Sequence, residues 1–345
     1  MSSELGEVRT EDAFDVDAVH GWLRKSADVP PEIPHVQQFG AGASNLTYLL
    51  TYKDQELILR RPPVGTKAVS AHDMKREFTI QKVLLPDFPI VPKVVALCQD
   101  LSVIGSDFYV MKKIEGVILR RNLPKDLSLT LEDITLIGDL VIDGLVSLHH
   151  VDSTPLAQLS RGPGYVGRQV KGWSRRYRAA RTPDVADAEV LMGWLDEHQP
   201  DDVASCVIHG DWRLDNLVLN LENRPRLVGA LDWELATVGD PLMDLGSSMA
   251  YWVDRNDEAD FAKLRRQPTH LPGMPTRDEF IARYLEKTEW GCEDFTFYEI
   301  FGIFRLTVIL QQIWARYFAG QTSNPAFAGF GDAVNIMINR AMRMI

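Results

Sequence analysis

The stretch Cys206–Leu219 constrains the fold of this chain more than any other part of it. Apolar residues form both of its ends, Cys206–Ile208 and Leu217–Leu219, and the short loop between them carries histidine, glycine, aspartate, arginine and asparagine. Apolar runs on both sides of a polar loop predict two short strands that hold the loop in place. A second apolar run, Leu227–Leu231, leads directly into the carboxylate of Asp232. The sequence therefore predicts polar catalytic groups supported by short strands.

These two segments contain the side chains that phosphoryl transfer requires. Asp211 offers a carboxylate that can orient a hydroxyl group, while Asn216 and Asp232 offer the hard oxygen ligands that Mg²⁺ prefers. An ordinary aspartate is a weak base, so we expect Asp211 to contribute mainly through its position. Arg213 lies in the same loop, where a cation can reach the transferring phosphoryl group. We predict Asp211 and Arg213 as catalytic residues, and Asn216 and Asp232 as metal ligands.

The spacing of these residues resembles that of the aminoglycoside phosphotransferase family. The similarity is strong over Cys206–Leu245 and continues more weakly from about Gln38. Within that family, the chain is similar to the kinase domains that are linked to acyl-CoA dehydrogenases. The motifs that carry the resemblance are His209-Gly210-Asp211 followed by Asn216, then Leu231-Asp232-Trp233-Glu234, and then Gly239-Asp240-Pro241 followed by Asp244.

The resemblance implies an α+β, protein-kinase-like fold of two lobes that binds ATP and Mg²⁺. Residues 1–115 would form an N-terminal nucleotide-binding lobe, built on an antiparallel sheet and carrying an accessory helix. Residues 116–345 would form a mostly helical C-terminal lobe with the catalytic loop and the substrate pocket. The backbone of Lys113 and Ile114, just before the hinge, would hydrogen-bond adenine. Asp244 would support the backbone of the catalytic loop.

Further residues of the N-terminal half are expected to hold the nucleotide. Ile58 and Arg60 share one face of a predicted strand, and the resemblance implies that Arg60 replaces the usual lysine at the phosphates. Glu77 on the next helix would pair with Arg60, the alternative being an exposed surface acid. Arg61 should face away, towards solvent or the substrate. The turn between the first two predicted strands has small side chains that let backbone N–H groups approach phosphate, although a plain hairpin loop has the same composition. Its expected ligands are Gly40, Gly42, Ser44 and Asn45.

Hydrophobic periodicity predicts the other elements. A helix from Thr10 to about Leu23 either packs on the small lobe or forms a dimer contact, and Leu131–His150 should be the central buried helix of the large lobe. In the predicted catalytic loop, Asp215 should cap its turn or face solvent. The predicted strands are Val36–Phe39, Leu46–Tyr52, Glu56–Arg60, Val94–Cys98 and Phe108–Ile114. The other predicted helices are Ser70–Leu85, Glu189–His198, Arg277–Lys287, Phe295–Ala319 and Ala326–Met344.

A block of basic residues between positions 161 and 181 is unusual in a chain with a net charge of −11. It is either a solvated helical face or an anion-binding patch beside the active cleft. Such a patch would repel a polycationic aminoglycoside and attract an acceptor that carries phosphate, such as a coenzyme A thioester. The block consists of Arg161, Arg168, Lys171, Arg175, Arg176, Arg178 and Arg181, interleaved with Tyr165, Trp173 and Tyr177.

Composition narrows the classes of protein to consider. The negative net charge argues against non-specific nucleic-acid binding. The three cysteines are far apart, which fits a reducing cytoplasm. No apolar run approaches the roughly 20 residues that span a bilayer, and the start of the chain lacks the pattern of a signal peptide. We therefore expect a cytoplasmic protein that binds neither nucleic acid nor membrane.

We predict a small-molecule O-phosphotransferase that moves the γ-phosphate of ATP to a substrate hydroxyl. A hydroxyacyl-CoA-like or other anionic acceptor is the first choice, and an aminoglycoside or another antibiotic is the alternative. A nucleotide-binding pseudokinase is a further alternative, favoured only by the arginine at position 60. A Ser/His hydrolase is disfavoured because the chain lacks a Gly-x-Ser-x-Gly elbow.

Overall fold

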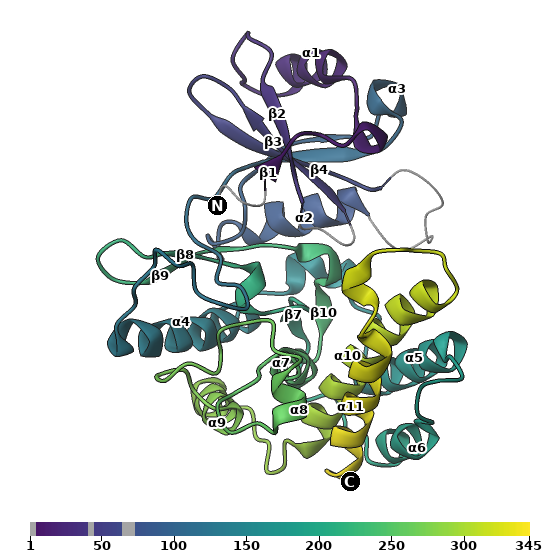
Figure 1. The fold of residues 1–345 in the computed structure, drawn as a ribbon. Coiled ribbons are helices and arrows are strands. Elements are labelled where there is room, and N and C mark those ends of the chain that lie inside the picture. The colour runs from purple at the N-terminus through teal and green to yellow at the C-terminus, as the bar shows by residue number, and fades with distance from the viewer. Residues whose placement is uncertain (1–4, 41–44, 64–72) are drawn as a thin grey trace. The chain divides into compact units, whose positions relative to one another are not determined.

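The computed structural model describes residues 5–40, 45–63 and 73–345 (Figure 1). The contacts within the chain divide it into two compact units. The first unit comprises positions up to 117 together with Val218–Leu221 and Val228–Ala236, and the second unit comprises the rest. The division into domains at 1–115 and 116–345 stays a prediction.

The first unit contains a six-stranded sheet with the order β1-β2-β3-β4-β6-β5, in which all neighbours are antiparallel. The antiparallel sheet expected for the N-terminal lobe is confirmed. Strand β1 was not predicted, because two residues are too few to show the alternation of a strand. The strands are β1 (Leu5–Gly6), β2 (His35–Phe39), β3 (Leu46–Thr51), β4 (Glu56–Arg61), β5 (Val94–Cys98) and β6 (Phe108–Lys112).

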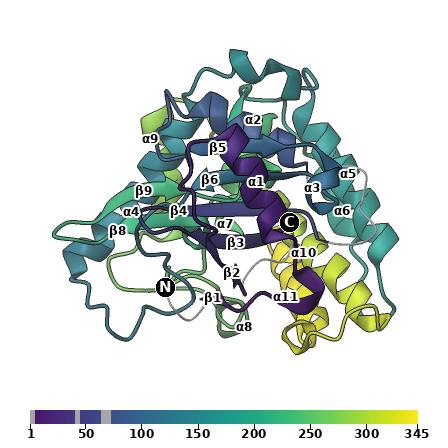
Figure 2. The ribbon, with the colours of Figure 1, turned by 90° about the horizontal axis from the view of Figure 1, so that it is seen from above.

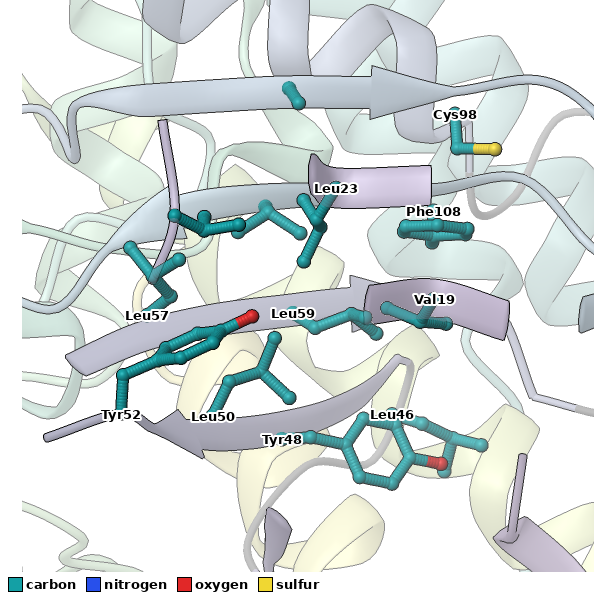
Figure 3. Close-up of a cluster of buried hydrophobic side chains, with 13 residues drawn as sticks. Val19, Leu23, Leu46, Tyr48, Leu50, Tyr52, Leu57, Leu59, Cys98 and Phe108 are labelled. Atoms are coloured by element: carbon teal, nitrogen blue, oxygen red, sulfur yellow. The ribbon is translucent and has the colours of Figure 1, made fainter. Parts of the chain in front are cut away.

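Helices cover both faces of this sheet (Figure 1). Helix α1 (Val16–Ser26) lies across the strands in Figure 2 and buries Val19 and Leu23 against them. Helix α2 (Met74–Leu84) covers the other face, where Met74 packs with Leu49 and Ile58. Each large aliphatic side chain buried in this way stabilises the fold by about 1.5–3 kcal/mol. Figure 3 shows the α1 face, whose labelled residues are Val19, Leu23, Leu46, Tyr48, Leu50, Tyr52, Leu57, Leu59, Cys98 and Phe108.

The N-terminal helix begins later than predicted. Thr10 starts only a short 3-10 turn, Thr10–Asp12. The helix itself begins after Asp15, whose side chain accepts a hydrogen bond from the backbone N–H of Ala18 at 2.9 Å. An aspartate in this position satisfies a backbone donor that would otherwise lack a partner, so it defines the start of the helix. This helix was expected either to pack on the small lobe or to form a dimer contact, and the structure shows it packed on the sheet.

The prediction that Arg61 faces solvent or substrate is wrong. Its side chain is only 3% exposed, and its guanidinium donates to the backbone carbonyl of Asp12 at 2.6 Å and to the hydroxyl of Tyr48 at 3.1 Å. Side chains alternate along β4, so Arg61 faces the side opposite to Arg60. Helix α1 covers that side, and Arg61 is therefore enclosed instead of solvated.

The second unit is mainly helical, as expected for the C-terminal lobe, but its central helix is not the one predicted. Helix α4 buries one face only, whereas every residue of α7 is buried. Helix α10 contacts α5, α7 and α11. Glycines allow α7 and α10 to approach closely, since a Cβ atom at Gly302 would lie 1.9 Å from the carbonyl oxygen of Gly246.

The remaining elements complete the order of the chain. Strands β7 and β10 form a short antiparallel pair, and strands β8 and β9 form another short pair. Among the described residues, no helix is both long enough and apolar enough to span a membrane. The helices are α3 (Leu101–Ile104), α4 (Leu131–His149), α5 (Tyr165–Ala180), α6 (Glu189–Glu197), α7 (Pro241–Met249), α8 (Ala259–Ala262), α9 (Arg277–Thr288), α10 (Thr296–Phe318) and α11 (Phe330–Met342). The strands are β7 (Cys206–Ile208), β8 (Leu217–Asn220), β9 (Arg226–Ala230) and β10 (Thr237–Gly239).

Candidate active site

The predicted catalytic loop runs between two short strands, as the sequence indicated. Strand β7 ends at Ile208, and strand β8 begins at Leu217 after a 3-10 turn. Gly210 adopts a left-handed backbone with a φ of 80°, a conformation that glycine reaches without the steric cost of a Cβ atom. The chain therefore turns sharply just before Asp211.

Asp244 fixes the backbone of this loop, which confirms its predicted role. Its carboxylate accepts hydrogen bonds from the backbone N–H groups of His209 and Gly210, both at 2.8 Å. His149 lies 3.1 Å from the same carboxylate and contacts the hydroxyl of Tyr284 with its other ring nitrogen. Burial alone would raise the pKa of Asp244, but its hydrogen bonds and the charge of the neighbouring histidines lower that pKa below its usual value. A buried carboxylate that accepts several hydrogen bonds is a rigid support for the loop.

Further contacts hold the loop at other points. The indole N–H of Trp212 donates to the carbonyl of Val141 in α4 at 3.0 Å. The side chain of Gln267 accepts from the backbone N–H of Leu214 at 2.6 Å. Arg305 of α10 donates to the carbonyl of Gly210 at 2.6 Å. The loop is thus anchored by groups from several parts of the second unit, which limits its freedom to move.

The Asp211 carboxylate is surrounded by groups that orient it. The side-chain amide of Asn216 donates to its Oδ2 at 2.8 Å, and Nε of Arg213 lies 3.2 Å from the same oxygen. The hydroxyl of Tyr251 is also hydrogen-bonded to Asp211, and the Arg213 guanidinium stacks over the Tyr251 ring at 4.7 Å. Burial, together with the negative charge of Asp211, raises the pKa of Tyr251 to about 12. Tyr251 is therefore a neutral donor at physiological pH.

Asp215 differs from its prediction. Its side chain is only 14% exposed and lies 3.7 Å from the guanidinium of Arg213, so it does not face solvent. Burial raises the pKa of Asp215 above its usual value. The 3-10 turn Leu214–Asn216 directs this side chain inward, and Asp215 becomes a partner of the predicted catalytic arginine.

In the first unit, Arg60 lies among carboxylates. Its guanidinium donates to Asp232 at 2.9 Å and lies 3.6 Å from Glu77 and 3.8 Å from Glu234. Glu77 is 1% exposed, so the expected pairing with Arg60 is confirmed and the alternative of a surface acid is wrong. Burial raises the pKa of Glu77, and the charge of Arg60 opposes that rise. Tyr109 donates to Glu77 at 3.0 Å and completes this buried polar cluster.

Asp232 is the most solvent-accessible of the acidic residues in this cluster. It follows β9 and has a left-handed backbone with a φ of 67°, which is unusual for a residue other than glycine. Its side chain is 34% exposed, whereas that of Arg60 is 10% exposed. The carboxylate of Asp232, at the end of the strand, is thus partly accessible to solvent.

The residues of the predicted phosphate-binding turn are only partly described. Gly42 and Ser44 lie outside the described residues, and Gly40 forms a bend at the end of β2. The side chain of Asn45 is buried and donates to Glu77 at 3.1 Å and to Glu234 at 3.0 Å. Asn45 therefore belongs to the polar cluster around Arg60.

The predicted adenine-binding segment follows the end of β6 at Lys112. The ammonium group of Lys113 pairs with Glu56 and lies 2.9 Å from Glu115. Ile114 packs close to Gly229, where a Cβ atom would lie 2.9 Å from its side chain. The contact of this segment with adenine stays a prediction.

The structure therefore assembles two groups of predicted site residues, one in each unit. Sequence reasoning missed Tyr251, Arg305, Tyr109 and Glu234 as parts of these groups. Glu234 lies within a recognised motif and could have been included, but the two tyrosines and Arg305 have no pattern that distinguishes them from core residues. The second-unit group contains Asp211, Arg213 and Asn216, and the first-unit group contains Asn45, Arg60, Glu77 and Asp232.

The oxygen atoms of these groups suit Mg²⁺. Because Nδ2 of Asn216 donates to Asp211, the amide oxygen Oδ1 points to the other side. A carboxylate and an amide oxygen are hard ligands of the kind that Mg²⁺ accepts, with water and phosphate oxygens completing its shell. In the described parts of the chain, no three His, Cys, Asp or Glu side chains are arranged to hold a metal. Asn216 of the second unit and Asp232 of the first unit each offer such an oxygen, and their joint role as metal ligands stays a prediction.

An antiparallel sheet with a buried cation–glutamate pair, followed by a helical unit with an Asp–Asn loop, defines a protein of the protein-kinase-like class. The chain belongs to the family described as "Phosphotransferase enzyme family", whose sequence profile matches residues 35–280. This confirms the resemblance seen in the sequence.

Known proteins agree with this assignment. Acyl-CoA dehydrogenase family member 10 of Mus musculus is 35% identical over 340 residues, which cover 97% of this chain but only 31% of that relative. A crystal structure of a Ralstonia eutropha protein, provisionally described as an aminoglycoside phosphotransferase, has a TM-score of 0.80 and 28% identity, with 96% and 98% of the two chains covered. Choline kinase from Cryptosporidium parvum shares the fold, with a TM-score of 0.62 at 13% identity and coverages of 95% and 96%.

Proposed function

We propose that this protein is an ATP-dependent small-molecule phosphotransferase that moves the γ-phosphate of ATP to a substrate hydroxyl. The observation that carries this proposal is the oriented carboxylate of Asp211. Its neighbours Asn216, Arg213 and Tyr251 hold it in a loop whose backbone is fixed by Asp244. Such rigidity suits phosphoryl transfer, in which positioning and electrostatic stabilisation supply most of the catalysis.

In the proposed reaction, the substrate hydroxyl oxygen forms a bond to the γ-phosphorus while the bond to the oxygen of the ADP leaving group breaks. Asp211 accepts the hydroxyl proton, a role that typically contributes about 10²–10⁴-fold in rate. Arg213 stabilises the charge on the transferring group, and its contact with Asp215 keeps it near the loop. ADP and an O-phosphorylated product leave the enzyme.

We further propose that Asn216 and Asp232 hold Mg²⁺, which would neutralise charge on the phosphates of the nucleotide. Arg60 would bind the phosphates with its forked donors, because arginine, like lysine, carries a permanent charge at physiological pH. The backbone of the turn Gly40–Asn45 would bind phosphate, and the backbone of Lys113 and Ile114 would bind adenine. The buried pair with Glu77 supports the role of Arg60 by fixing the direction of its side chain.

For the acceptor, we propose a hydroxyacyl-CoA-like or other anionic molecule. The basic residues of α5 favour a negatively charged group, and the mouse relative's name links it to acyl-CoA chemistry. An aminoglycoside is the alternative, favoured by the description of the Ralstonia eutropha protein. These two acceptors carry opposite charges, so they can be distinguished directly.

A panel of hydroxylated acceptors with labelled ATP and Mg²⁺ tests the proposal. Transfer to hydroxyacyl-CoA thioesters by the wild-type protein, lost in Asp211→Ala with the fold retained, is the expected result. Transfer only to kanamycin-type compounds would overturn the choice of acceptor. Binding of Mg²⁺-ATP without transfer to any acceptor would favour a pseudokinase, and undiminished turnover by Asp211→Ala would refute the role of Asp211.

A further inference from the structure

The basic block of α5 separates into different environments in the structure. Arg178 pairs with Glu189 at 2.6 Å, and Arg181 pairs with Asp187 at 3.1 Å. Both arginines therefore belong to surface ion pairs at the C-terminal end of the helix. Such residues have a structural partner already, and they are poor candidates for ligand binding.

The middle of the helix is different. Arg175 and Arg176 have no ion pair with a carboxylate within the described ranges, and the guanidinium of Arg176 lies 4.5 Å from the centre of the Trp173 ring. A third arginine, Arg305 of α10, lies 5.3 Å from the centre of the same ring. Arg305 is far from the basic block in sequence, and no spacing rule could have connected it with Trp173.

Arg305 also connects this cluster to the catalytic loop. Its side chain is 7% exposed, and one of its nitrogens donates to the carbonyl of Gly210 at 2.6 Å. Gly210 immediately precedes Asp211 in the chain. No carboxylate of the described residues forms an ion pair with Arg305 either, so a largely buried guanidinium has a backbone carbonyl and an aromatic ring as its observed partners.

Positive charges that lie close together repel one another. Burial lowers the pKa of Arg176, and the positive charges of Arg175 and Arg305 lower it further. An oxyanion between them would relieve this repulsion. Guanidinium groups match phosphate well, because their N–H donors form paired, charge-assisted hydrogen bonds with its oxygens.

We propose that Arg176 and Arg305, which both lie against the Trp173 ring, form a subsite with the neighbouring Arg175 that binds a phosphate or diphosphate group of the acceptor. The inference rests on the proposed function, since it assigns this group to the molecule whose hydroxyl reacts at Asp211. The subsite recognises the acceptor at a point remote from the reacting hydroxyl and leaves the chemistry to the loop. The competing reading is that Arg305 only braces the loop while Arg175 and Arg176 are solvated.

Calorimetric titration with inorganic pyrophosphate, in the absence of nucleotide, tests the subsite itself. The variant Arg175→Met/Arg176→Met removes two charges from exposed positions and keeps an aliphatic side chain at position 176, beside Trp173. The matched control is Arg178→Met on the same helix. We expect the wild-type protein and the control to bind equally, and the double variant to bind at least about tenfold more weakly. Equal binding by all three proteins would overturn the proposal.

Steady-state kinetics with two acceptors separate this inference from the proposed function. For an acceptor that carries phosphate, the double variant should raise KM at least about tenfold with little change in kcat, while the KM for ATP stays the same. For a neutral hydroxylated acceptor, it should change neither constant. An unchanged KM for the phosphate-bearing acceptor would overturn the subsite. If no acceptor is phosphorylated but pyrophosphate binding still depends on Arg175 and Arg176, the proposed function fails and the subsite stands.

Discussion

Replacing Asp244 by asparagine should both destabilise the protein and slow it. The carboxylate accepts from the N–H groups of His209 and Gly210 through different oxygens, and His149 contacts one of them. Asparagine keeps one oxygen and replaces the other by an NH₂ group, which cannot accept. In either orientation of the amide, at least one buried backbone N–H is left facing a donor.

The magnitude follows from these contacts. A buried donor without a partner costs about 1–3 kcal/mol, and the surviving bonds weaken by about 1 kcal/mol when the acceptor loses its charge. The free energy of unfolding should therefore fall by about 2–4 kcal/mol. At about 2–4 °C per kcal/mol for a unit of roughly 200 residues, Tm should fall by about 5–15 °C.

Denaturant titration and calorimetry of Asp244→Asn measure this effect, with Asp143→Asn as the control. Asp143 is about half exposed and pairs with Lys287 on the surface, so its replacement should change the free energy of unfolding by less than about 1 kcal/mol. The kcat of Asp244→Asn should also fall, because the loop that presents Asp211 loses its support. An Asp244→Asn protein as stable as the control would refute the assignment of Asp244 as the anchor of the loop.

Other replacements test separate parts of the structure. Tyr251→Phe removes the hydroxyl bound to Asp211 and should lower kcat about tenfold at nearly unchanged Tm, so an unaltered kcat would exclude a positioning role. Arg60→Met leaves Glu77 and Asp232 without their buried cation and should lower the free energy of unfolding by about 3–5 kcal/mol; a loss below about 1 kcal/mol in denaturant titration would contradict the importance of this pair. Burial opposes ionisation of Asp257, but the hydrogen bonds and charge of Arg277 lower the pKa of Asp257 below the ordinary 3.8. The stabilisation that the ionised Asp257 provides is therefore present above about pH 4 and is lost as pH falls through its folded-state pKa. Asp257→Asn should flatten the decline of unfolding free energy between about pH 4 and pH 2, and identical acid profiles of the two proteins would count against this.

The elements of the first unit could be predicted because their patterns are local. Each predicted strand alternates or is continuously apolar, and its ends agree with the structure to within about two residues. The errors have tertiary causes. Arg61 was misplaced because alternation tells which side of β4 it faces but not that α1 covers that side. The sequence could not show that α7 and α10, and not α4, pack at the centre of the second unit, because their packing depends on glycines that meet between the helices.

The site was predictable to the extent that its groups follow each other in the chain. Asp211, Asn216 and Asp244 lie in one stretch of motifs, and the contact of Asp244 with the loop was expected. Tyr251, just after α7, and Arg305 of α10 lie farther along the chain than the loop residues Asp211 and Gly210 that they contact. No sequence pattern predicts the partner of a buried tyrosine or arginine, so these contacts can be identified only in the folded structure.

The affinity for Mn²⁺ in the presence of ADP, measured by electron paramagnetic resonance, tests the proposed metal site most directly. Asp232→Asn and Asn216→Ala should each weaken Mn²⁺ binding at least about tenfold, because each removes or neutralises one oxygen ligand. Asp211→Asn should bind Mn²⁺ almost as tightly as the wild-type protein while losing phosphoryl transfer. Wild-type Mn²⁺ affinity in both Asp232→Asn and Asn216→Ala would contradict the assignment of these two residues as the ligands of the metal.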